Sequence, residues 1–302
     1  MNAAAPDPQK PAVSSAGDGH EAASGAGRRG PRKRSGVERG GGPPRLNMKP
    51  RVFIDDLAQL QLTFAKEFET QAAEVIARRE KCIVALPGGS VASAFFPTLA
   101  TLAVDWTRIE IFWIDERAVP PDHPDSNAAL ASRLLLIPAR VPARRIHRMH
   151  GELPDLDQAA RRATDELKSI AGDPPHLDLA IVGVGDDGHV ASIFPSRPGA
   201  RADSSADLPA EARGAKVGAR SAKAELPVIA VYDSPIPPAR RLTLTLSVLA
   251  NASQLIVAAF GASKAEAMRG ALHASGVTTP IARLLRSAPS SLVLLDRAAG
   301  LS

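Results

Sequence analysis

The sequence predicts an α/β fold in which a mainly parallel sheet carries helices on both faces. From residue 55 onward, short apolar runs alternate with longer segments of helical periodicity. Strands that alternate with helices favour parallel pairing through helical crossovers, and a sheet of this kind is covered on both sides. The length of 302 residues is enough for one large α/β domain or two small ones.

The expected elements follow one another along residues 56–295. A long amphipathic helix at 56–79 precedes a strand at 81–86, which ends at Pro87-Gly88-Gly89 and leads into a helix at 91–102. The next elements are a strand at 108–114 and helices near 127–136 and 157–170. Further strands are expected at 178–184, 228–231, 242–246, 255–259 and 291–295, with a helix at 263–272 before the last strand. Residues 197–225, rich in Ala, Arg, Gly and Ser, are expected to form a surface excursion.

We expect residues 1–47 to be a disordered tail and residues 48–302 to form a single α/β catalytic domain. The first segment is rich in Ala, Gly, Pro and Ser and has no Phe, Tyr or Trp, so it buries too little apolar surface to offset its ordering entropy. Met48, where folded-type sequence begins, is a candidate start of translation. The alternative for the basic run 28–34 is a nucleic-acid or targeting arm.

Charge and composition exclude several classes of partner. Residues 1–48 hold eight Lys or Arg against four acidic residues, which accounts for four of the five net positive charges of the chain. The remainder is close to neutral, so no nucleic-acid partner is expected. No apolar stretch is long enough to span a membrane. The single cysteine, Cys82, forms no internal disulfide, and this composition predicts a cytoplasmic location.

Polar residues follow three of the expected strands, where ligands of open α/β sheets bind. Gly88, Gly89 and Ser90 open a helix, whose N-terminal N–H groups favour an anion, and Ser90 is able to cap that helix. The alternative is a tight turn with an N-cap. This segment is neither a Walker loop nor a G-x-G-x-x-G turn.

The second segment is Asp115-Glu116-Arg117, which directly follows the apolar strand at 108–114. Charged residues at this position are costly to bury unless they are paired or used, and Arg117 suits a phosphate or carboxylate. A surface ion-pair turn is the alternative. Ser126 or Asn127, shortly afterwards, is a candidate cap for the helix that follows.

The third segment, residues 183–189, carries the strongest signal. Asp187 and His189 lie two residues apart among glycines, and histidine is the side chain that ordinarily titrates near neutral pH. His189 therefore suits a general base, with an acidic neighbour to hold its ring. A structural Asp/His turn is the alternative. No H-x-x-x-H or paired-cysteine spacing is present, so no metal is expected.

Five stretches in this order resemble the 6-phosphogluconolactonase family, part of a wider group that includes glucosamine-6-phosphate deaminases and isomerases. They are ALPGGS (85–90), WIDERAVPPDHPDSN (113–127), GVGDDGHVASIFP (183–195), RRLTLTLSVLANA (240–252) and GASKAEAM (261–268). The resemblance spans roughly residues 55–296. It implies a modified Rossmann-like α/β sandwich and hydrolysis of 6-phospho-D-glucono-1,5-lactone in the oxidative pentose phosphate pathway, without a cofactor, by a monomer or small homo-oligomer.

The resemblance also assigns roles to individual residues. His189 is implied as the general base for a water molecule, with Asp187 and Arg117 as further catalytic residues. Substrate or phosphate binding is implied for Gly88, Gly89, Ser90, Asp115, Arg241 and Lys264. For Arg241 and Lys264 the alternative is ordinary solvation at a strand or helix end.

Two alternative functions remain at this point. A deaminase or isomerase of the wider group has Asn-Glu-Pro where this chain has Ile193-Phe194-Pro195, and Asp-Glu-Tyr where it has Asp115-Glu116-Arg117. Both differences favour the lactonase. A sugar-phosphate sensor that contacts DNA would need a helix-turn-helix segment, and residues 1–47 contain none. The Ser192–His189 pair lacks the G-x-S-x-G turn of a serine nucleophile.

Overall fold

The computed structural model describes residues 49–195 and 226–300, all of which belong to one compact unit that covers residues 45–302. The predicted tail at 1–47 and the predicted excursion at 197–225 lie outside the described residues. No helix in the described part is long and apolar enough to cross a membrane.

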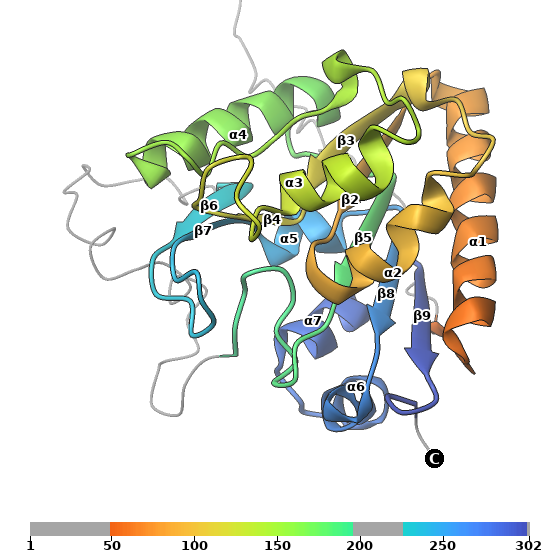
Figure 1. Ribbon diagram of the computed structural model, residues 1–302. Coiled ribbons are helices and arrows are strands. Elements are labelled where there is room, and N and C mark those ends of the chain that lie inside the picture. Colours follow the sequence, from red (N-terminus) through yellow and green to blue (C-terminus); the bar gives the residue numbers. More distant parts are fainter. Residues whose placement is uncertain (1–48, 196–225, 301–302) are drawn as a thin grey trace, which may run out of the picture. The chain divides into compact units, whose positions relative to one another are not determined.

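The described residues form a six-stranded parallel sheet with the order β1-β9-β8-β5-β2-β3 (Figure 1). A second sheet is antiparallel, with the order β4-β7-β6. The strands are β1 (Arg51–Asp55), β2 (Cys82–Leu86), β3 (Ile109–Trp113), β4 (Asp115–Arg117), β5 (Leu179–Gly183), β6 (Val228–Val231), β7 (Arg241–Leu244), β8 (Gln254–Ala259) and β9 (Ser291–Asp296). The predicted α/β fold with a mainly parallel sheet is confirmed.

Helices cover both faces of the parallel sheet, as predicted. They are α1 (Leu57–Arg79), α2 (Gly89–Leu99), α3 (Asn127–Ala131), α4 (Leu156–Ala171), α5 (Leu246–Ala250), α6 (Ala265–His273) and α7 (Pro280–Ser287). Side chains of α1, α2 and α3 share one hydrophobic core with one face of the sheet. Side chains of α4, α5, α6 and α7 share a second core with the other face.

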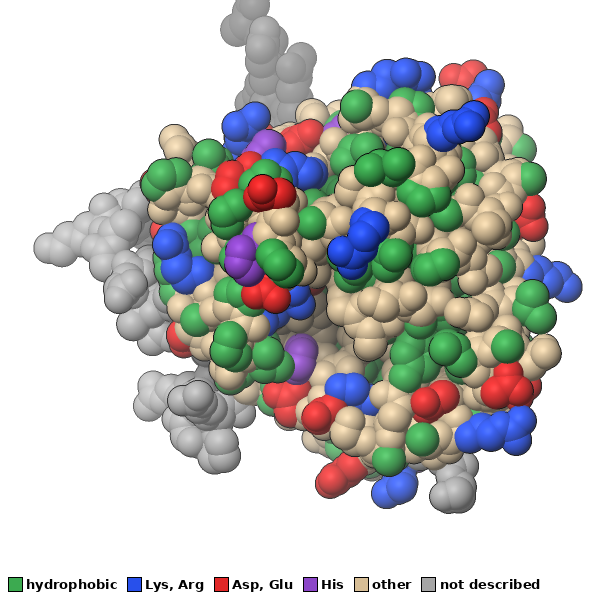
Figure 2. Space-filling view, viewed as in Figure 1, with side chains coloured by type: hydrophobic (Ala, Val, Ile, Leu, Met, Phe, Trp, Pro, Cys, Tyr) green, Lys and Arg blue, Asp and Glu red, His purple; other side chains and the backbone are tan. Residues whose placement is uncertain are grey.

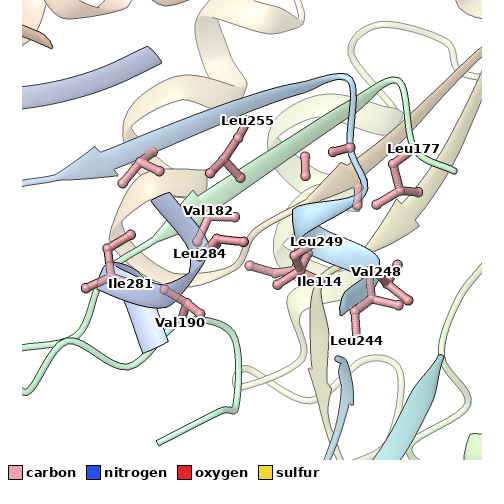
Figure 3. Close-up of a cluster of buried hydrophobic side chains, with 14 of the residues drawn as sticks. Ile114, Leu177, Val182, Val190, Leu244, Val248, Leu249, Leu255, Ile281 and Leu284 are labelled. Carbon is pink, nitrogen blue, oxygen red and sulfur yellow. The ribbon is translucent and has the colours of Figure 1, made fainter. Parts of the chain in front are cut away.

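Alternation along each parallel strand divides the side chains between the two cores. In β2, Ile83 and Ala85 belong to the core beneath α4, while Val84 and Leu86 belong to the core beneath α1. Successive side chains of a strand point to opposite faces, so a strand buried on both sides is apolar throughout. Figure 3 shows the core on the α5 and α7 side, where Val182 and Leu255 of neighbouring strands meet Leu284.

Local sequence sets the ends of the longer helices. Asp56 caps α1 by accepting a hydrogen bond from the backbone N–H of Gln59 at 3.0 Å, and Asp155 caps α4 through Gln158 at 2.9 Å. Gly172, with φ of 91°, ends α4, because a residue without Cβ adopts this left-handed region at little cost. The predicted boundaries of both helices are therefore correct to within a residue.

Four elements were not predicted: β1, β4, α5 and α7. The strand expected at 242–246 ends at Leu244 because Leu246 begins α5, and the helix expected near 127–136 is α3 followed by a π-helical turn, Ser132–Leu136. The helix expected at 91–102 begins at Gly89 and ends at Leu99. Ser90 does not cap it, since Gly88 occupies the N-cap position and no side chain makes a capping bond. The prediction of a Ser90 cap was wrong because the helix begins two residues earlier than expected, which places Ser90 inside its first turn.

Candidate active site

The three polar segments meet at one edge of the parallel sheet. Because the six strands run the same way, the residues after β2, β3, β5 and β8 all emerge at the carboxyl edge, where ligands of such sheets bind. Asn127 links two of the segments: its amide nitrogen donates to the carbonyl oxygen of Asp115 at 2.9 Å, and its Oδ1 lies against Gly88. Figure 2 shows a hollow in this face, with His, acidic and basic side chains at its margin.

His189 and Asp187 form a pair in the loop after β5. Nδ1 of His189 lies 2.6 Å from Oδ1 of Asp187, and the same oxygen accepts the backbone N–H of His189 at 3.0 Å. An acceptor at Nδ1 favours the tautomer with the proton on Nδ1, which leaves the lone pair on Nε2. Nε2 makes no hydrogen bond to a described residue. The His189 side chain is 16% exposed, so its ring reaches solvent from a mostly enclosed position.

The His189 ring lies between Gly185 and Phe194. A Cβ at position 185 would lie 1.9 Å from both Nδ1 and Cε1 of the ring, so only glycine leaves this space. On another side the Phe194 ring lies 4.5 Å away, centroid to centroid, with the planes tilted by 39°. The loop closes on itself through the backbone N–H of Gly185, which donates to the carbonyl of His189 at 2.9 Å. Packing and hydrogen bonding together restrict the imidazole to one orientation.

The turn after β2 exposes backbone donors. A Cβ on Gly88 would overlap Oδ1 of Asn127 at 1.8 Å, and Gly89 adopts a left-handed φ of 62°, so both positions require glycine. Among the described residues, none accepts a hydrogen bond from the backbone N–H groups of Gly89, Ser90 or Val91. These first-turn N–H groups carry the positive end of the α2 dipole and suit an anionic oxygen.

Asp115 and Glu116 are buried and hydrogen bonded, so the segment after β3 is not a surface ion-pair turn. Glu116 accepts the backbone N–H groups of Arg117, Asn127 and Ala128 at 2.7 to 2.8 Å, and thereby caps α3. Burial raises the pKa of Glu116 above its ordinary value, although these backbone donors oppose the shift. Ser126 completes the cap by accepting from the backbone N–H of Ala129 at 3.1 Å.

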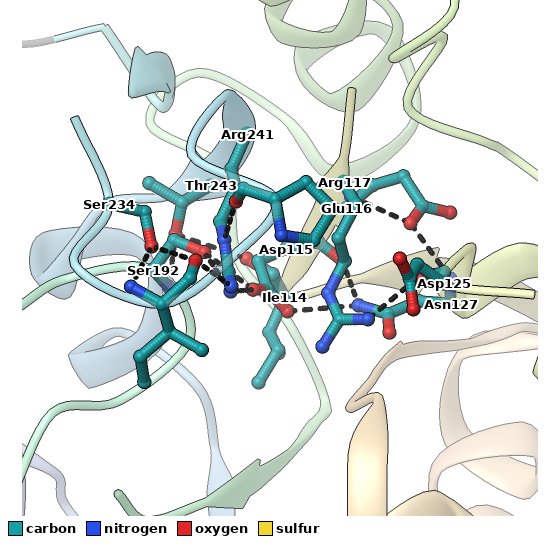
Figure 4. A network of polar contacts seen from close by, with 12 residues as sticks. Ile114, Asp115, Glu116, Arg117, Asp125, Asn127, Ser192, Ser234, Arg241 and Thr243 are labelled. Carbon is teal, nitrogen blue, oxygen red and sulfur yellow. Dashed lines mark hydrogen bonds and ion pairs between the residues drawn. The ribbon is translucent and has the colours of Figure 1, made fainter. Parts of the chain in front are cut away.

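The three predicted anion-binding cations have different surroundings. Arg117 donates from Nη1 to the carbonyl of Asp125 at 2.7 Å, and its buried Nε has no partner among the described residues. Lys264, after β8, pairs with Asp186 of the His189 loop, and this pairing lowers the pKa of Asp186. Arg241 is 3% exposed and donates to carbonyl oxygens of Ile236, Pro237 and Pro238. Arg117 ends β4 and Lys264 lies in the helical turn after β8, and both are partly exposed. Arg241, on β7, is buried beside Asp115 and Ser192 (Figure 4).

Sequence reasoning did not assign a site role to Asn127, Ser192 or Thr243. Asn127 was considered only as a helix cap and Ser192 only as a nucleophile. In the structure both residues join the Asp115 segment to a neighbouring loop. Asn127 donates to the carbonyl oxygen of Asp115 at 2.9 Å, and Ser192 Oγ donates to Asp115 Oδ2 at 2.6 Å. Ser192 and Asp115 are 77 residues apart, so no local pattern indicates this contact. Among the described residues, no group of three or more His, Cys, Asp or Glu side chains is placed to hold a metal ion.

Comparison with known proteins decides the family. Residues 55–293 match the model described as glucosamine-6-phosphate isomerases/6-phosphogluconolactonase. The chain belongs to this family. It is 33% identical over 243 residues to a 6-phosphogluconolactonase of Pseudomonas putida, with 80% of this chain and 91% of the relative covered. It is 31% identical over 270 residues to the 6-phosphogluconolactonase of Streptomyces coelicolor, with 82% and 95% covered.

Solved structures share the fold of this family member. A 6-phosphogluconolactonase of Thermotoga maritima has a TM-score of 0.66 at 24% identity and covers 82% of this chain and 100% of its own. A 6-phosphogluconolactonase of Trypanosoma brucei also has a TM-score of 0.66, at 23% identity, and covers 83% and 97%. The predicted family and the Rossmann-like sandwich are confirmed.

Proposed function

We propose that the chain hydrolyses 6-phospho-D-glucono-1,5-lactone to 6-phosphogluconate by attack of a water molecule that His189 deprotonates. The observation that carries this proposal is the His189–Asp187 pair, whose Nδ1 contact at 2.6 Å leaves Nε2 without a described partner at the carboxyl edge of the sheet. Relatives at 31% to 33% identity are named 6-phosphogluconolactonases, which supports the same reaction.

The reaction needs one base and one stabilised oxyanion. Nε2 takes a proton from water while the oxygen attacks C1 of the lactone, and the carbonyl oxygen becomes negatively charged. The N–H groups of Gly89 and Ser90, together with Arg117, are the candidate donors for this oxyanion. When the C1–O5 bond breaks, the ring oxygen leaves as the C5 hydroxyl and takes the proton from the imidazolium of His189. The ester is already electrophilic, so the reaction needs neither a covalent nucleophile nor a cofactor.

Asp187 and Lys264 complete the proposed assignment. Asp187 holds the imidazole and stabilises its charged form during the transfer. Lys264 is the proposed cation for the 6-phosphate, whose binding orients the ring for attack. The proposal includes a cytoplasmic location and action as a monomer or small homo-oligomer.

The decisive experiment measures acid release from freshly prepared 6-phosphogluconolactone against the spontaneous rate. We expect strong acceleration, and a far lower kcat/KM on gluconolactone without the phosphate. Inorganic phosphate should compete weakly. No acceleration would contradict the proposed reaction, and equal efficiency on the two lactones would contradict the proposed phosphate site. Ammonia release from glucosamine 6-phosphate would instead identify the isomerase activity of the wider group.

A further inference from the structure

A buried polar cluster lies behind the His189 loop and consists of Asp115, Ser192 and Arg241. These residues are 5%, 3% and 3% exposed. Ser192 Oγ donates to Asp115 Oδ2 at 2.6 Å, and Nη1 of Arg241 lies 3.4 Å from Ser192 Oγ and 3.8 Å from Asp115 Oδ2. Figure 4 shows the three side chains pointing toward one another. A buried serine hydroxyl therefore bridges a buried ion pair.

The cluster joins the His189 loop to the antiparallel sheet. Asp115 lies on β4 and Arg241 on β7, and Asp115 is the register partner of Thr243 on β7. Thr243 Oγ1 accepts the backbone N–H of Ser192 at 3.2 Å. Both the backbone and the side chain of Ser192 are thus fixed to one pair of strands.

Ser192 belongs to a tight turn that directly follows His189. Val190 and Ile193 exchange backbone hydrogen bonds at 2.9 and 3.2 Å, and Ala191 between them has a left-handed φ of 51°. A residue with a Cβ adopts this region only where its surroundings impose it. The three contacts of Ser192 hold Ala191 in this conformation from one neighbouring residue. Val190, the other neighbour of Ala191, is fully buried in the core.

The remaining donors of Arg241 also bind protein. Nε donates to the carbonyl of Pro238 at 2.9 Å, and Nη2 donates to that of Ile236 at 2.8 Å. The guanidinium therefore connects the β6–β7 loop, β4 and the His189 loop from the interior. Arg241 is more deeply buried than Arg117, its register partner on β4, and than Lys264, which are both partly exposed.

We propose that Ser192, Asp115 and Arg241 are positioning residues, which set the place of the His189 imidazole and do not bind the substrate. This inference rests on the proposed function, because it takes His189 as the base. A general base displaced by about 1 Å loses up to about 100-fold in rate, while the binding of a remote phosphate handle is unaffected. Substitutions in this cluster should therefore lower kcat and leave KM close to the value of the parent enzyme.

The first experiment compares Ser192→Ala with Ser291→Ala. Ser291 is a matched control, because it is also buried and its Oγ has no partner among the described residues. At a temperature where both variants are folded by circular dichroism, Ser192→Ala should lower kcat about 10-fold to 100-fold with little change in KM. Ser291→Ala should remain within about two-fold of the parent, since no hydrogen bond is lost. A Ser192→Ala enzyme with parental kcat would overturn the proposal.

The second experiment separates positioning from phosphate binding in Arg241→Met. A positioning role predicts the same fold-loss of kcat/KM on 6-phosphogluconolactone and on unphosphorylated gluconolactone. A phosphate ligand would instead lose efficiency on the phosphorylated lactone alone, with a raised KM, and that result would overturn the proposal.

A third measurement does not depend on catalysis. In protein labelled with ¹⁵N-histidine, Ser192→Ala should shift or broaden the imidazole resonances of His189, while Ser291→Ala should leave them unchanged. If the parent fails to hydrolyse the lactone, the proposed function fails, and this spectrum still tests the positioning. Unchanged His189 resonances in Ser192→Ala would contradict it.

Discussion

At the scale of single residues, the candidate site depends on the surroundings of one imidazole ring. Asp187 contacts Nδ1 at 2.6 Å, Gly185 leaves room for one face, and Phe194 packs within 4.5 Å, centroid to centroid. The hydrogen bond selects the tautomer and the packing selects the orientation, so the nitrogen without a described partner is Nε2, which the proposed mechanism uses as the base.

Replacement of His189 by alanine should remove the base and preserve the fold. General-base assistance is worth roughly 10²-fold to 10⁴-fold in rate, so kcat for the phosphorylated lactone should fall by that range. KM should change little because the proposed phosphate ligands are intact. Steady-state kinetics and thermal unfolding of His189→Ala provide the check. A folded variant within a few-fold of the parental kcat would show that another group activates the water.

Gly185→Ala should displace the ring without removing it. The added Cβ would lie 1.9 Å from two ring atoms, and such an overlap forces the imidazole to move. We expect kcat to fall about 10-fold to 100-fold, since a shift near 1 Å is costly for a positioned base. Gly270→Ala in α6 is the control, because its Cβ would make only ordinary contacts at 3.7 Å. Equal kcat in the two variants would contradict the importance of ring placement.

At the scale of elements, a histidine connects β3 to α4. His147 Nε2 lies 2.9 Å from Oε2 of Glu110 on β3, and Nδ1 lies 2.8 Å from Oε1 of Glu166 on α4. Its ring stacks on Phe112 at 4.7 Å, and Arg145 also pairs with Glu110. Burial lowers the pKa of His147, but the hydrogen bonds to Glu166 and Glu110 outweigh burial and raise this pKa above its ordinary value.

The raised pKa makes stability depend on pH. Because folding favours the protonated ring, the stabilisation is complete below the ordinary histidine pKa of about 6.5 and is lost as the pH rises through the raised value in the folded state. The Tm of the parent should therefore fall more between pH 6 and pH 9 than the Tm of His147→Gln. Parallel thermal unfolding curves at several pH values measure this difference. Identical pH profiles would show that the charged ring adds no stability.

At the scale of the whole chain, the part that matches the family model begins at residue 55. The described residues of the compact unit contain both core clusters and every proposed site residue. The two sheets meet at the site, since the β4–β7 pair contacts the His189 loop through Ser192. The proposed chemistry therefore draws on residues of both sheets.

A chain that begins at Met48 should keep the activity and Tm of the full chain. Removal of the first 47 residues takes away none of the contacts described for the site and none of the family match. Kinetics and thermal unfolding of the shortened chain, compared with the full chain under the same conditions, test this expectation. Loss of most of the activity would show that the N-terminal segment contributes to the enzyme.

The sequence by itself determined the fold class and indicated the edge of the sheet at which the candidate site lies. Apolar runs such as 108–114 and 178–184 become strands buried on both faces, because few other structures bury so many consecutive apolar side chains between two helical layers. Because parallel strands all end at the same edge of the sheet, the polar residues that follow these strands mark its carboxyl edge. Periodicity did not reveal β1, whose residues are mostly exposed, or β4, which consists of Asp115, Glu116 and Arg117.

Only the tertiary structure decided which polar residues are enclosed and which reach the carboxyl edge. Arg241 and Lys264 are both cations near the end of a predicted element, yet Arg241 is buried against Ser192 and Asp115 while Lys264 pairs at the surface with Asp186. Arg241 also bonds to nearby carbonyl groups, but Ser192 lies 49 residues away in the chain and Asp115 lies farther still. The local sequence indicates whether a segment forms a helix or a strand. Whether a charged side chain is buried depends instead on the groups that the fold brings around it.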